Sequence, residues 1–120
     1  MIMPYIHLRT SRVLGEEDLH ALQKIIVEDL ARYLSKPPAR CMVQIDAGQC
    51  LLMGDGAADC AFVEVLVRGR FDIAVKDAFG TAFLEDVAAG LALTPERVYL
   101  YLQETHDGEV TGTIYISGQR

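Results

Sequence analysis

The chain repeats itself at a fixed distance. Shifting the sequence by 57 residues aligns its two halves without a gap. The apolar positions at helical spacing coincide in this alignment, where Leu22, Ile26, Leu30 and Leu34 fall on Phe79, Phe83, Val87 and Leu91. The strand positions also coincide, with Ile6 on Val63 and Leu8 on Val65. A duplication restricts the possible folds strongly, because the unit that one half forms is expected again in the other half.

The sequence pattern of each half predicts a strand, a helix and a second strand. The expected elements cover residues 4–8, 15–34 and 41–46 in the first half, and 60–67, 73–91 and 98–103 in the second. A β-α-β connection makes its two strands parallel and puts the helix on one face of the sheet. We therefore predict an α/β (α+β) fold in a single domain over 1–120, with the internal repeat 4–46 and 61–103. Its four-stranded mixed sheet carries two helices on one face.

Two segments lie outside this repeat. Residues 47–59 are expected to form a loop that holds one minor strand at 50–53, and residues 112–116 a short final strand after a polar turn at 104–109.

The face of the sheet that no helix covers predicts self-association. Apolar side chains expected on that face are Met42, Phe62, Leu66, Tyr99 and Tyr101. An apolar sheet face is not left in water, and two helices are too few to cover both faces. We therefore expect further copies of the chain to cover it.

Composition narrows the range of partners. The net charge is −6 and the pI about 4.9, and no basic run occurs, which argues against nucleic acid and membrane as partners. The three cysteines, Cys41, Cys50 and Cys60, form neither a disulfide framework nor a metal motif. The sequence shows no signal peptide and no membrane span, so a cytoplasmic protein without a bound metal is expected.

Four short motifs, in the order of the repeat, carry a family resemblance. They are Met3-Pro4-Tyr5-Ile6, Lys36-Pro37-Pro38, Cys60-Ala61 and Pro95-Glu96-Arg97-Val98-Tyr99. With the duplication, the chain resembles the tautomerase superfamily, and within it the macrophage migration inhibitory factor branch. The resemblance implies a homotrimer whose sheets line a central channel, with active sites between neighbouring subunits. It also implies keto–enol tautomerisation of small 2-oxo acids such as phenylpyruvate, without a cofactor.

The resemblance assigns roles to three residues. Pro4 takes the place of the catalytic proline, Lys36 that of a lysine that binds the substrate carboxylate, and Tyr99 that of a pocket tyrosine supplied by the neighbouring subunit. The chain departs from the family pattern in several ways. Tyr101 replaces an asparagine, Val63 replaces the second cysteine of a Cys-x-x-Cys motif, and the sequence contains no tryptophan.

The turn after the third main strand is altered as well. Arg68 and Arg70 flank Gly69 there and add positive charge near the expected pocket. We count Arg68 and Tyr101 with Lys36 and Tyr99 as candidate substrate-binding residues, although a surface role explains the arginines equally well.

Whether the protein can act as a tautomerase depends on the nitrogen of Pro4. A free secondary amine can take up and return a proton, whereas an acylated proline nitrogen can do neither. Met1-Ile2-Met3 would acylate Pro4 and occupy the mouth of the pocket, unless the mature chain starts at Pro4. Whether the protein is an enzyme therefore stays open. The alternatives are a tautomerase, a catalytically silent trimer that binds or signals, and a dehalogenase or decarboxylase that also uses Arg68 or Arg70.

Overall fold

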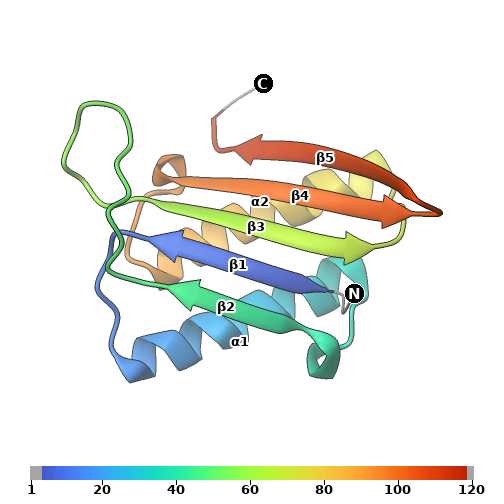
Figure 1. Ribbon diagram of the computed structural model, residues 1–120, viewed down its shortest axis with the longest axis horizontal. Helices are drawn as coiled ribbons and strands as arrows, with labels where there is room; N and C mark the ends of the chain where they lie inside the picture. Colours follow the sequence, from blue (N-terminus) through green and yellow to red (C-terminus); the bar gives the residue numbers. More distant parts are fainter. Residues whose placement is uncertain (1–3, 119–120) are drawn as a thin grey trace.

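The computed structural model of the protein describes residues 4–118, and Met1, Ile2 and Met3 lie outside the described residues. The expected order of the main helices and strands is confirmed (Figure 1). The elements are β1 (Tyr5–Thr10), α1 (Glu16–Leu34), η1 (Pro38–Arg40), β2 (Met42–Asp46), β3 (Ala61–Arg68), α2 (Ile73–Gly90), η2 (Pro95–Arg97), β4 (Val98–His106) and β5 (Glu109–Ile116).

All the strands join one mixed sheet in the order β2-β1-β3-β4-β5. Within each β-α-β unit the strands are parallel, β1 with β2 and β3 with β4, while β1 and β3 run antiparallel. Figure 1 shows both helices on the same side of the sheet. The α+β fold is therefore confirmed, but the expected number of four strands was wrong, because β5 adds a fifth strand antiparallel to β4.

The fifth strand is part of a hairpin that is longer than the sequence predicted. Residues 104–109 were expected to be a polar turn, yet β4 continues to His106 and β5 begins at Glu109. The turn is only Asp107-Gly108, whose φ angles of 49° and 82° are both positive, as a two-residue hairpin turn requires. Glu104 can lie in the strand because Lys76 of α2 neutralises it at 2.9 Å.

The segment between β2 and β3 contains no strand among the described residues, so the minor strand expected at 50–53 was wrong. The amide of Gly48 donates to the carbonyl of Arg12 at 2.7 Å, and that of Gln49 to the carbonyl of Thr10 at 3.0 Å. Beyond these bonds the chain projects from the end of the sheet before it returns at Ala61 (Figure 1).

Both helices form where the sequence places an apolar stripe. In α1 three acidic residues occupy the first turn, where they complement the helix dipole, and Ser35 ends the helix in the left-handed region with φ 55°. The buried stripe of α1 includes Leu22, Ile26, Leu30 and Leu34. In α2 the rings of Phe79 and Phe83 lie 5.0 Å apart and are fully buried.

The core lies between these helices and one face of the sheet. Alternate residues of the three central strands are completely buried there: Ile6, Leu8, Val63, Val65, Leu100 and Leu102. Burying a side chain of this size stabilises the fold by roughly 1.5–3 kcal/mol. The buried side chains of the strands and those of the helical stripes thus form one continuous apolar cluster.

The opposite face of the sheet carries no helix, and we call it the open face. It presents Tyr5, His7, Arg9, Met42, Gln44, Asp46, Phe62, Glu64, Leu66, Tyr99, Tyr101, Gln103, Ile114 and Ile116. Around β1 this face is more polar than expected, because His7 pairs with Asp46 of β2 at 2.6 Å and Arg9 pairs with Glu64 of β3 at 2.6 Å. Towards β4 and β5 it is apolar, and Tyr99 and Ile114 are 36% and 54% exposed.

Candidate functional site

Pro4 lies at the beginning of β1, in the position where a strand tolerates proline. It is buried, like Ile6 and Leu8, which alternate with it along the strand. Its carbonyl accepts a hydrogen bond of 3.0 Å from the amide of Met42, at the start of the neighbouring β2. Tyr5 pairs with Leu66, so the antiparallel register continues to bring Pro4 beside the last residues of β3.

Lys36 reaches the same end of β3 from α1. The helix ends at Leu34, the left-handed Ser35 turns the chain, and two prolines that follow Lys36 prevent the helix from continuing. The Nζ atom of Lys36 donates a 2.6 Å hydrogen bond to the carbonyl of Arg68 and lies 5.4 Å from the centre of the Phe71 ring. No carboxylate within residues 4–118 forms an ion pair with this ammonium group, so its charge is available to an anionic ligand.

The turn that follows β3 holds the two candidate arginines in different surroundings. Arg68 is exposed and belongs by alternation to the open face, whereas its carbonyl is the one that holds Lys36. Arg70 is also exposed and forms an ion pair with Glu109 of β5 at 3.1 Å. Gly69 between them has φ 128°, a conformation that a residue with a side chain rarely adopts.

Tyr99 lies far from this group within one chain. In the sheet Tyr99 pairs with Phe62, and Phe62 pairs with Arg9, which is five residues along β1 from Pro4. At a rise of about 3.3 Å per residue, this separation is roughly 17 Å along the strand direction alone. The structure therefore places Pro4 and Lys36 near the same end of β3, where Lys36 binds the backbone of Arg68, and leaves Tyr99 at the opposite end of the sheet.

Tyr101 takes up an intermediate position on the open face. It pairs with Glu64, which pairs with His7, and its hydroxyl donates a hydrogen bond of 3.3 Å to Gln103. Its ring covers Gly112 of β5, where a Cβ atom would come within 2.6 Å of the ring. Tyr101 is thus partly occupied with packing on its own hairpin and does not reach Pro4 in the same chain.

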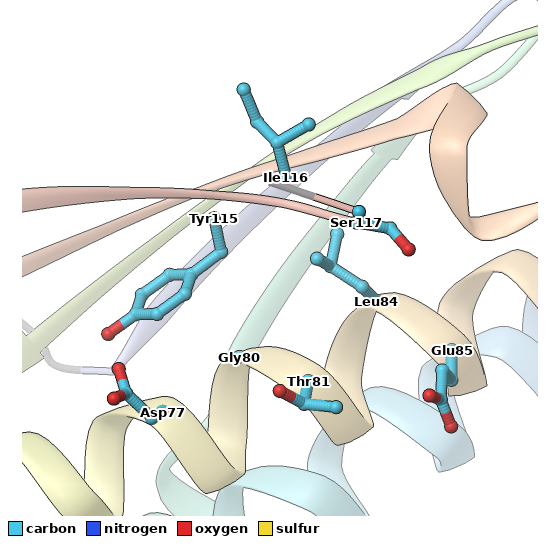
Figure 2. A pocket seen from close by; sticks show the side chains of 9 residues that line it. Asp77, Gly80, Thr81, Leu84, Glu85, Tyr115, Ile116 and Ser117 are labelled. Carbon is cyan, nitrogen blue, oxygen red and sulfur yellow. The ribbon is translucent and has the colours of Figure 1, made fainter. Parts of the chain in front are cut away.

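A cavity of about 430 Å³ lies away from this site, between α2 and β5 (Figure 2). Figure 2 shows Tyr115 over Gly80 with its hydroxyl pointing toward Asp77. Burial, together with the charges of Asp77 and Glu104, raises the pKa of Tyr115 to about 12. The phenol therefore stays protonated at neutral pH, and none of the predicted site residues lines this cavity.

The three cysteines lie in different surroundings. Cys41 and Cys50 are free, and so is the buried Cys60. Burial raises the pKa of the Cys41 thiol, although the nearby Lys36 ammonium opposes the shift. A thiol is reactive when its pKa is lowered, so Cys41 is a packing residue in these surroundings.

Residues 4–118 contain neither a metal-binding cluster nor a membrane-spanning helix. No group of three or more His, Cys, Asp or Glu side chains is arranged to hold a metal ion there. None of the helices in this part of the chain combines the length and the apolar character that are needed to cross a bilayer.

The family model for macrophage migration inhibitory factor (MIF) matches residues 3–113, nearly the whole of the repeat and its hairpin. The chain belongs to the MIF family. The resemblance inferred from the four motifs and the duplication is thereby confirmed. A search of curated protein sequences gives no significant match.

Solved structures of MIF proteins share this fold at low sequence identity. MIF2 of Leishmania major is 17% identical, with a TM-score of 0.77 over 86% of this chain and 89% of that one. The MIF homologue of Prochlorococcus marinus is 18% identical, with a TM-score of 0.76 over 89% and 98% of the two chains. The MIF of Trichinella spiralis is 17% identical, with a TM-score of 0.74 over 90% and 100%.

The sequence did not reveal two residues that lie beside the candidate site. Phe71 contributes the aromatic face under Lys36, and its amide donates to Glu104 at 2.8 Å. Glu104 is 4% exposed and also binds Lys76. Glu104 follows Leu100 and Leu102 at the same spacing along β4, so the alternation could have predicted that its side chain is buried. A buried carboxylate needs a cationic partner.

Proposed function

We propose that this MIF-family protein is a keto–enol tautomerase of small 2-oxo acids such as phenylpyruvate, with Pro4 as the general base and acid. The observation that supports it most is that buried Pro4 and the charged end of Lys36 adjoin the same end of β3. Tautomerisation of a 2-oxo acid requires a proton acceptor and a fixed cation close to each other. The cation holds the carboxylate while the base moves a proton at the adjacent carbon.

The proton transfer needs a single group of suitable pKa. A free proline amine in an apolar environment beside a cation loses part of its affinity for a proton, because both influences disfavour its charged form. The base would then be unprotonated often enough near neutral pH to remove a proton from carbon. The same group would return the proton to the other position, so no cofactor is needed.

Assembly as a homotrimer is part of the proposal. Tyr99 is about 17 Å along the strand from the Pro4 end of its own chain, so it can serve a pocket only in a neighbouring copy. The apolar part of the open face, which includes Leu66, Tyr99 and Ile114, supplies the surface that association would cover. In such an assembly Tyr99 and Tyr101 from one copy would border the Pro4 and Lys36 of another.

A catalytically silent MIF-like binding or signalling protein is the second candidate. The observation that favours it is the sequence Met1-Ile2-Met3 before Pro4, because an acylated proline nitrogen has no basic lone pair. The fold and the trimer would be unchanged, and only the chemistry of the Pro4 nitrogen would differ.

The experiment compares two forms of the same chain, one beginning at Met1 and one beginning at Pro4. Each N-terminus is verified by intact mass, and each form is assayed with phenylpyruvate in the enol-to-keto direction. We expect ready activity from the form that begins at Pro4 and little from the other. The Pro4→Ala variant of the shorter form is the matched control, since it keeps a free amine but replaces the ring. Equal activity of the long and short forms would show that Pro4 is not the base.

A further inference from the structure

Two carboxyl groups meet between the helices, on the layer away from the candidate site. Asp29 of α1 is 3% exposed, and its carboxyl group lines the same small cavity as that of Asp86 on α2. Within residues 4–118 the Oδ2 atom of Asp29 has no donor group as a partner. Neither residue belongs to the apolar stripes, and neither takes part in the proposed tautomerisation.

A hydrogen bond between these two carboxyl groups would require a proton. An ionised carboxylate only accepts hydrogen bonds, so two ionised aspartates cannot be hydrogen-bonded to each other. A buried carboxylate oxygen without a donor is also costly, because nothing replaces the water that it loses. The pair is therefore satisfied when one of the two carboxyl groups carries the proton and donates it to the other.

The surroundings do not supply a substitute for that proton. The pair borders a cavity of about 290 Å³ between the helices, lined by Ile25, Glu28, Asp29, Arg32, Asp86 and Ala89. The charged groups that act on Asp29 are Asp86 from α2 and Glu28 and Arg32 from α1. Arg32 is the one cation among them, and the other two groups are acidic.

We propose that Asp29 and Asp86 form a proton-binding clasp that joins α1 to α2 and holds the two helices together more firmly in mildly acidic than in alkaline solution. When the proton leaves, two like charges face each other across the interface. Like charges this close repel, and the buried one has lost its hydrogen bond. The clasp thus makes the stability of the fold depend on pH in the neutral range.

The direction of the pH dependence follows from the pKa of Asp29. Burial raises it from 3.8 to about 7, and the hydrogen bond to Asp86 and the Asp86 charge add to the increase. A carboxyl group with a raised folded-state pKa binds its proton more tightly in the folded than in the unfolded chain. This contribution to stability is complete below the unfolded pKa and is lost as the pH rises through about 7.

The experiment compares urea unfolding of the wild type, Asp29→Asn and Asp86→Asn at pH about 6 and about 8, at one protein concentration. An asparagine amide donates permanently where the proton did, so each variant should keep its clasp at both pH values. For the wild type we expect the folding equilibrium constant to fall by about tenfold more than that of either variant between these pH values. Glu17→Gln, on an exposed position of α1, changes the net charge equally and should behave like the wild type.

A second measurement does not depend on any variant. Carbon-13 NMR of the aspartate side-chain carboxyl carbons in the wild type should show one group that titrates near neutral pH. If every aspartate titrates near pH 4, the clasp is absent. The proposal also fails if Asp29→Asn and Asp86→Asn lose stability with pH as steeply as the wild type does.

Discussion

The Nζ atom of Lys36 lies 2.6 Å from the carbonyl oxygen of Arg68, so the end of α1 is tied to the end of β3. Lys36 and Arg68 are 32 residues apart in the sequence, and Lys36 lies two residues beyond α1 while Arg68 is the last residue of β3. The bond fixes the cation beside the strand that borders Pro4 and leaves further N–H donors of the ammonium for a ligand.

Replacing Lys36 by alanine should weaken substrate binding more than it slows turnover. The ammonium would hold the carboxylate about equally in the ground state and the transition state, so KM should rise roughly tenfold with a smaller change in kcat. Steady-state kinetics with phenylpyruvate measures this on the form that begins at Pro4. Arg70→Ala, which removes an exposed cation already paired with Glu109, is the control and should leave KM nearly unchanged. A large fall in kcat at constant KM would place Lys36 in the proton transfer instead.

Two inactive variants should restore activity when they assemble together. Tyr99→Ala keeps Pro4, and Pro4→Ala keeps Tyr99, so a mixed trimer contains sites that combine one intact residue from each chain. If equal amounts of the two variants mix at random, about a quarter of the sites should contain both Pro4 and Tyr99. The variants are unfolded together, refolded and assayed against each variant refolded alone. Activity no higher than the sum of the separate samples would mean that Tyr99 does not complete a neighbour's site.

A charge on the apolar part of the open face should prevent assembly. Leu66 lies there between Tyr5 and Gln103 in the sheet register, and Leu66→Asp would bury an unpaired carboxylate in any contact between copies. Such a burial costs several kcal/mol, so the assembly should dissociate. Light scattering at micromolar concentration measures the mass. Gln49→Asp, on the exposed loop, introduces the same charge and should not change the mass. A wild type with the mass of a single chain would contradict the proposed trimer itself.

Gly80 should not tolerate even one methyl group. A Cβ atom at this position would lie 2.5–2.9 Å from the ring of Tyr115, which packs across α2 from β5. We expect Gly80→Ala to destabilise the fold by about 1–3 kcal/mol, because overpacking outweighs the better helix propensity of alanine. Thermal unfolding measures the loss. Gly56→Ala is the matched control, since no atom lies within 4 Å of the Cβ atom it would add.

Lys76 should matter far more to stability than Arg70, although each forms one ion pair with a glutamate. The Lys76–Glu104 pair has side-chain exposures of 14% and 5%, whereas Arg70 and Glu109 are 67% and 75% exposed. Lys76→Ala leaves a buried carboxylate without its cation and should cost about 3–5 kcal/mol. Arg70→Ala should cost less than about 1 kcal/mol, as is usual for exposed pairs. Urea unfolding of the two variants compares the costs directly, and similar losses would contradict the burial argument.

The sequence alone determined the elements whose patterns are local. The apolar stripe of α1 at helical spacing, the alternation in β1 and β3, and the shift of 57 residues between the halves predict two β-α-β units in order. From these units follow the parallel pairs and the shared helical face, since such connections allow almost no other arrangement. The four motifs, in register with the duplication, also indicated the family.

Only the tertiary structure decided the length of the final hairpin, its pairing in the sheet and the neighbours of the site residues. Glu104 looks like a turn residue in the sequence, and it lies in a buried strand because Lys76, 28 residues away, neutralises it. Phe71 lies under Lys36, and Tyr99 lies remote from Pro4, because strand register sets these distances and no local pattern encodes it. The meeting of Asp29 and Asp86 likewise depends on how two helices pack. Local periodicity fixes which residues form an element, whereas contacts between elements fix the charge and the exposure of each side chain.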